Sequence, residues 1–83
     1  MPEKRVGIVK DYFAKIGVAG IELQAPLRSG DRIHIKGHTT DLEQTADSIQ
    51  IDRVPVEEAK RGAAIGIKVK DRCRDGDVVY KIT

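Results

Sequence analysis

The sequence predicts an all-β domain folded as a small closed barrel. Three observations support this prediction: the chain has only 83 residues, its apolar residues alternate with polar ones, and turn residues separate the alternating stretches. A chain of this length has room for one core, so we assign residues 1–83 to a single domain. Closure into a barrel would leave no exposed sheet edge.

The first two strands are expected over Arg5–Phe13 and Ile16–Gln24, where valine, isoleucine and leucine are frequent. Gly7, Gly17 and Gly20 lie inside these stretches. Glycine within a strand favours a bulge or a sharp bend, because it has no side chain to pack. Both stretches therefore suit the strongly curved strands of a small barrel.

The alternation is clearest in four later stretches of the chain. Their apolar members are Ile33 and Ile35; Ile49 and Ile51; Ile65, Ile67 and Val69; and Val78, Tyr80 and Ile82. Each stretch has one apolar and one mostly polar face, as in an antiparallel sheet that covers a core on one side. We expect the apolar face of each strand to be buried.

The segment Val54–Gly62 is expected to form one short helical turn. Pro55 suits the first helical position, Glu57 and Glu58 come early, and Gly62 suits the stop. The adjacent glutamates would not face each other in such a turn, so they are not expected to act as an acid–base pair.

Two segments repeat one pattern. Leu27–Ile33 and Cys73–Val79 both place the sequence Arg-x-Gly-Asp directly before a strand. Because glycine and aspartate are typical turn residues, we interpret the repeat as one turn used twice rather than as a functional repeat. Six or seven strands and one helical turn are expected in total.

Composition argues against a strongly basic protein, a disulfide-stabilised protein and a membrane protein. The 15 Lys and Arg residues against 13 Asp and Glu leave a net charge of +2, and aromatic residues make up only 4% of the chain. A single cysteine, Cys73, excludes an internal disulfide. No signal segment and no run of about 18 apolar residues is present, so we expect no membrane association and a cytoplasmic location.

No catalytic, cofactor or metal site is expected. The chain has no Gly-x-x-x-x-Gly-Lys-Ser/Thr loop for a nucleotide phosphate. The two histidines, His34 and His38, have no cysteine pair to complete a zinc site, and we expect both to be solvated on a strand face. Cys73 has no evident histidine base, so it is interpreted as a buried or partly exposed structural thiol.

Basic residues give the best lead to a binding function. Six of them lie within fifteen residues: Lys60, Arg61, Lys68, Lys70, Arg72 and Arg74. The last four share parity, so they would line one face if the strand continued that far, and such a stripe suits phosphate contacts. A solvated charged face is the alternative interpretation.

The order of the motifs resembles the second domain of translational GTPases such as elongation factor Tu. The matching stretches are Gly17–Leu23, Leu27–Gly37, Thr40–Asp52, Arg61–Ile67 and Gly76–Tyr80. The resemblance implies a six- or seven-stranded Greek-key barrel and a family that handles RNA. Similar barrels also occur as accessory domains at the ends of some bacterial peptidases of the collagenase type.

Two departures from this family are visible. The phosphate loop is absent, so the chain is no GTPase, and Ala63 and Ala64 stand where the family carries polar residues near its aminoacyl pocket. We therefore predict a stand-alone, non-catalytic module that binds tRNA or ribosomal RNA, with Tyr12 or Phe13 stacking on a base. The alternatives are a module that docks on a partner enzyme or ribosomal protein, and an accessory domain that acts with a collagenase-like peptidase.

Overall fold

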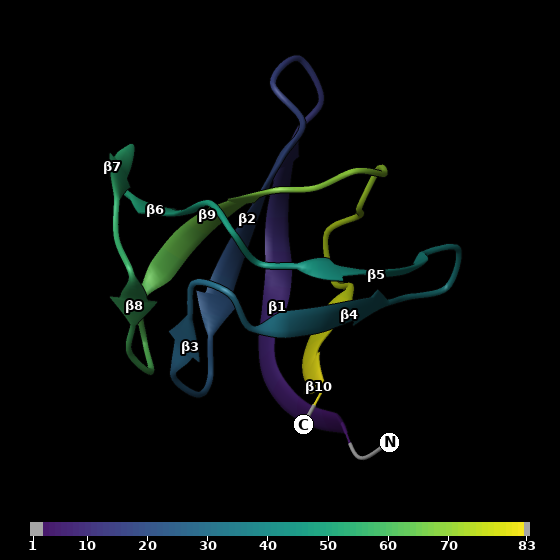
Figure 1. Cartoon of the computed structure of the whole chain (residues 1–83). Coiled ribbons are helices and arrows are strands. Elements are labelled where there is room, and N and C mark those ends of the chain that lie inside the picture. The colour runs from purple at the N-terminus through teal and green to yellow at the C-terminus, as the bar shows by residue number, and fades with distance from the viewer. Residues whose placement is uncertain (1–2, 83) are drawn as a thin grey trace.

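A computed structural model describes residues 3–82, and these form strands connected by turns, without a helix (Figure 1). The ten strands are β1 Glu3–Phe13, β2 Val18–Leu23, β3 Leu27–Arg28, β4 Arg32–Lys36, β5 Asp41–Thr45, β6 Ile49–Ile51, β7 Val54–Pro55, β8 Glu58–Ala59, β9 Ala64–Lys68 and β10 Val78–Ile82. The predicted all-β class is confirmed. Across this range, no helix long and apolar enough to cross a membrane is found.

Eight strands form one antiparallel sheet in the order β5-β4-β10-β1-β2-β9-β6-β7, and β3 pairs separately with β8. Figure 1 shows how strongly this sheet curves. Its hydrogen-bonded order does not return to its start, so the predicted closed barrel of six or seven strands is wrong.

The side chain of Gln44 on β5 joins β5 to the end of β9, where a closed barrel would have a continuous ladder of backbone hydrogen bonds. Its Nε2 donates a 2.8 Å hydrogen bond to the carbonyl of Lys68, and its Oε1 accepts one of 3.0 Å from the amide of Lys70. A glutamine side chain can satisfy both a carbonyl and an amide, so these edge groups are paired without a continuous ladder.

One buried cluster forms the core. Its members are Val6, Val9, Ala19, Ile21, Leu23, Leu27, Ile33, Ile35, Leu42, Ala46, Ile49, Ala59, Ile65, Ile67, Val69, Cys73 and Val79. The predicted apolar faces at Ile33 and Ile35 and at Ile65, Ile67 and Val69 are therefore confirmed, and in the Ile49–Ile51 stretch Ile49 is buried and Ile51 partly buried. In β10 the prediction is wrong, because Val79 pairs with buried Ile35 and faces the core, whereas Val78, Tyr80 and Ile82 are only partly buried.

Register shifts in β1 account for the sheet's sharp bends. In the pairing of β1 with β10 the shift falls between Arg5 and Gly7, and in the pairing of β1 with β2 it falls between Val9 and Asp11. A Cβ atom on Gly7 would lie 2.8 Å from the carbonyl oxygen of Glu22, so the close approach requires glycine. The predicted bulge at Gly7 is confirmed, whereas Gly17 lies in the turn before β2.

The helical turn predicted over residues 54–62 is wrong. Asp52 and Arg53 have φ angles of 50° and 66°, as in a two-residue hairpin turn that joins β6 to β7. Ala59 on β8 is buried and pairs with Leu27. Because a single helical turn gains little from its own hydrogen bonds, these strand pairings decide the conformation.

The repeated Arg-x-Gly-Asp pattern forms the same turn twice, as predicted. The amides of Arg28 and Arg74 donate to the Oδ2 atoms of Asp31 and Asp77, at 2.9 and 2.8 Å. The amide of each aspartate donates back to the arginine carbonyl at 3.1 Å. The glycine before each aspartate has a φ near +95°, which glycine adopts without strain.

Candidate functional site

A hollow of about 570 Å³ lies on the outer face of β2 and β9 and beside β6. We call it the trough and define it by Phe13, Ile16, Val18, Gly20, Ala64 and Gly66. Gly20 and Gly66 are cross-strand partners, so no side chain stands at its centre. The alternation of the strands places Ala19 and Ile21 in the core and turns the glycines outward.

Apolar side chains at one end of the trough are open to solvent. Phe13 is 51% exposed and Ile16 is 63% exposed. Contiguous exposed apolar surface in a small domain is typical of a docking site. Of the two aromatic residues predicted to stack on a base, Phe13 therefore lines the trough, whereas Tyr12 packs against the core.

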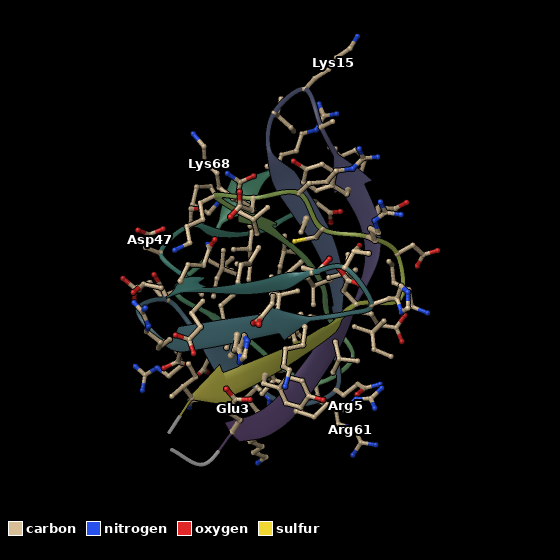
Figure 2. All side chains as sticks on the ribbon, turned by 90° about the vertical axis from the view of Figure 1, so that its right-hand side faces the viewer. Glu3, Arg5, Lys15, Asp47, Arg61 and Lys68 are labelled. Carbon is tan, nitrogen blue, oxygen red and sulfur yellow. The ribbon has the colours of Figure 1, made fainter. Side chains whose placement is uncertain are left out.

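A second region, which we call the His34 cluster, consists of Glu3, His34, Asp41 and Glu43. Nδ1 of His34 lies 2.6 Å from Oε2 of Glu3 and 3.9 Å from Oε1 of Glu43. Nε2 of the same ring contacts the carboxylate of Asp41. Figure 2 shows Glu3 next to the last strand, at the end of the molecule opposite Lys15.

The carboxylates change the acid–base behaviour of the ring. The hydrogen bond with Asp41 and the contacts with Glu3 raise the pKa of His34, against the opposing effect of burial. The hydrogen bond with His34 in turn lowers the pKa of Asp41. The neighbouring carboxylates therefore favour the imidazolium form of His34.

Sequence reasoning missed this cluster. The His34 side chain is only 12% exposed, so the predicted solvated histidine is wrong at this position, while His38 is exposed beyond the end of β4. The missing signal was the strand register: Glu43 lies directly opposite His34 on β5, and Glu3 reaches it across β10. Sequence spacing alone does not give that register.

Cys73 lies in the core, which agrees with the predicted structural thiol. Burial, together with the negative charges of Asp77 and Asp71, raises the pKa of its thiol to about 11. At neutral pH the side chain is thus almost entirely in the thiol form, which is a poor nucleophile.

The six basic residues predicted to bind RNA, Lys60, Arg61, Lys68, Lys70, Arg72 and Arg74, are all exposed. They do not share one strand face, because β9 ends at Lys68 and the chain then turns. Figure 2 shows Arg61 and Lys68 at opposite ends of the molecule. Contact between these residues and a partner stays a prediction.

The fold and the trough thus define a small, open antiparallel β-domain with an apolar hollow on one face. No protein-family model matches the chain. It is 42% identical over 76 residues to an uncharacterized protease of Methanocaldococcus jannaschii, which covers 90% of this chain and 19% of that protein. It is 38% identical over 72 residues to a collagenase of Porphyromonas gingivalis, with 84% and 20% covered. The chain therefore spans about a fifth of the length of these relatives.

Solved structures show the same fold. The C-terminal domain of a putative U32 peptidase from Geobacillus thermoleovorans matches with a TM-score of 0.89 at 19% identity, covering 96% of this chain and 93% of that domain. Its selenomethionine variant matches with a TM-score of 0.87, also at 19% identity, covering 92% and 96%.

These matches correct the family and function predicted from the sequence. The resemblance to the second domain of translational GTPases is wrong, and so is the prediction of a translation-factor-like RNA-binding module. The physical reason is visible at Arg28–Asp31: the shared motif is a hydrogen-bonded turn around a glycine with positive φ, which occurs twice in this chain. Such a turn specifies local β geometry and no ligand.

Proposed function

We propose that this chain is a non-catalytic accessory β-domain that acts with a peptidase of the U32 type. The observation that carries the proposal is the coverage of the matches: similarity to two proteases extends over most of this chain but only about a fifth of theirs. The fold of a U32 peptidase C-terminal domain supports the same assignment. The peptidase chemistry would then belong to the remaining four-fifths of such a protein.

The side chains support a role without catalysis. Cys73 is buried with a raised thiol pKa, and both ring nitrogens of His34 face carboxylates. Among residues 3–82, no hydrogen bond joins a histidine to a serine, threonine or cysteine. A nucleophile and base within hydrogen-bond reach are what acyl-transfer chemistry requires.

The trough is the surface that we assign to docking on the catalytic part of the peptidase. Its floor is bare backbone at Gly20 and Gly66, so an apolar side chain of the partner can approach closely. Phe13 and Ile16 supply exposed apolar area at its edge. Burying such anchors is the main source of affinity in protein interfaces.

A chimera tests the proposal. This chain replaces the matching 72-residue segment of the Porphyromonas gingivalis collagenase, and cleavage of gelatin is compared with that of a variant lacking the segment. We expect the deletion to lose most of its activity and the chimera to restore it. The isolated chain should cleave no gelatin.

Matched variants then test the docking face. Ile16→Asp places a charge in the trough, and Ala14→Asp places the same charge in the same turn but outside it. We expect Ile16→Asp to weaken the restored activity about tenfold, because a desolvated charge opposes docking, and Ala14→Asp to leave it unchanged. Equal effects of the two variants, or full activity after deletion, would refute the proposal.

A further inference from the structure

The His34 cluster brings together side chains of the kind that bind metal ions. One ligand atom each from Glu3, His34 and Glu43 lies within 4.8 Å of the other two. The three residues come from β1, β4 and β5: Glu43 lies directly opposite His34, and β1 is separated from β4 only by β10. Glu43 is 51% exposed at its side chain, so an ion can reach the cluster from solvent.

The backbone around the imidazole is rigid. Ile33 and Ile35, on either side of His34, are fully buried, and β4 pairs with β10 and β5 on its two edges. The ring therefore projects from a fixed point of the sheet. Rigid elements hold ligand geometry more accurately than loops do.

Asp41 adds an observation that is separate from the three ligand atoms. Its carboxylate contacts Nε2, on the opposite side of the ring from Glu3 and Glu43. In protein metal sites, the non-ligating ring nitrogen of a histidine usually donates to such a carboxylate, which fixes the tautomer and the ring orientation. With its proton held on Nε2, the ring offers the Nδ1 lone pair to the space shared with both glutamates.

The charge balance points in the same direction. Nδ1 can share only one proton, yet two carboxylates face it, and the ion pairs found for Glu3 and Glu43 within residues 3–82 both involve this nitrogen. An imidazolium neutralises one of the three surrounding carboxylates. A divalent cation would accept the nitrogen and both glutamates at once.

We propose that the His34 cluster binds one zinc ion through Nδ1 of His34 and the carboxylates of Glu3 and Glu43, with Asp41 as a positioning residue. One imidazole and two carboxylates are donors that zinc accepts, and a water molecule completes four-coordination. Calcium and magnesium prefer oxygen ligands alone, so the imidazole favours zinc. This site is separate from the trough and from the docking assigned to it.

The test is a titration of the chain with zinc at about pH 8, followed by calorimetry, because the ring must lose its ligating proton to bind the metal. We expect one zinc ion per chain. His34→Asn should weaken binding at least about tenfold, and Asp41→Asn about 10–100-fold, as is usual for loss of the carboxylate behind a ligating histidine.

His38→Asn is the matched control, because it removes an equally sized imidazole that is exposed and outside the cluster. It should bind zinc like the unchanged chain. Cobalt gives an independent readout, since its visible absorption reports coordination by this set of ligands. Glu43→Gln serves as a second ligand variant on an exposed position if His34→Asn fails to fold.

Absence of zinc binding by the unchanged chain would overturn the proposal. Equal losses in His34→Asn and His38→Asn would do the same, because the ion would then bind elsewhere. Both outcomes leave the chimera experiment unaffected, so failure of this site is distinguishable from failure of the docking role.

Discussion

The trough and the His34 cluster lie on outer faces of the same sheet but are built in opposite ways. The trough arises where side chains are missing, at Gly20 and Gly66 on two paired strands. The cluster arises where side chains converge, and His34 and Glu3 are 31 residues apart in sequence. A surface for docking thus needs only a local pairing of small residues, whereas a metal site needs the register of several strands to be correct.

Both regions rest on the same core, and the largest expected effect tests this. Ile67 follows Gly66 of the trough in β9 and Ile35 follows His34 in β4, and both are fully buried in one apolar cluster. We expect Ile67→Ala and Ile35→Ala each to lower the free energy of unfolding by about 2–5 kcal/mol. That is a large share of the roughly 4–12 kcal/mol expected for a chain of this length.

Urea denaturation followed by circular dichroism measures both variants. Each should unfold in a single transition with an unchanged dependence of the unfolding free energy on urea concentration, because a single core unfolds cooperatively as one unit. Two separate transitions in either variant would show that the regions rest on independent units.

Glycine substitutions should have different effects in the trough and in the segment that follows β4 and His34. A Cβ atom on Gly37, directly after β4, would overlap the carboxylate of Asp77, which is only 4% exposed. We expect Gly37→Ala to cost about 1–3 kcal/mol, as overpacking in a filled interior does. A Cβ atom on Gly66 would lie 3.2 Å from Cγ1 of Val18, a partly exposed side chain that can move.

Gly66→Ala should therefore stay within about 0.5 kcal/mol of the unchanged chain. Thermal unfolding of the two alanine variants checks the contrast. Equal destabilisation would mean that the floor of the trough is as tightly packed as the interior. In the chimera, Gly66→Ala should nonetheless weaken gelatin cleavage, because the added methyl group occupies the docking face.

The difference in construction also explains how far the sequence could be interpreted. Alternation predicted most strands, because one apolar face per strand is a local property, as at Ile33 and Ile35. It failed in β10, where three apolar residues face outward and Val79 alone enters the core. There the pairing with Ile35 decides the face, and a single strand's pattern does not contain that information.

The candidate sites show the same division. Gly20 was predicted only as a bulge or bend and Gly66 was given no role, because the cross-strand pairing of the two glycines is not visible in the sequence. The cluster was missed since Glu3, Asp41 and Glu43 carry no motif spacing relative to His34. The open edge of the sheet was also unforeseen, because Gln44 replaces the ladder through its side chain.

The smallest expected effect on stability separates a binding role from a structural role at the cluster. Glu43→Gln removes a charge from a side chain that is 51% exposed and 3.9 Å from Nδ1 of His34. Without zinc, the free energy of unfolding should change by less than about 0.5 kcal/mol, since exposed ion pairs contribute little. Zinc affinity should nevertheless fall about tenfold or more, because one of three protein ligands is lost.

Glu22→Gln makes the same change of charge at the trough, where the carboxylate is exposed. It should alter neither the stability nor the zinc affinity. Calorimetric titration of both variants, with chelator-treated samples for the stability measurements, tests the pair directly. If Glu43→Gln destabilised the metal-free chain strongly and left zinc binding intact, the carboxylates of the cluster would serve the fold and not a metal ion.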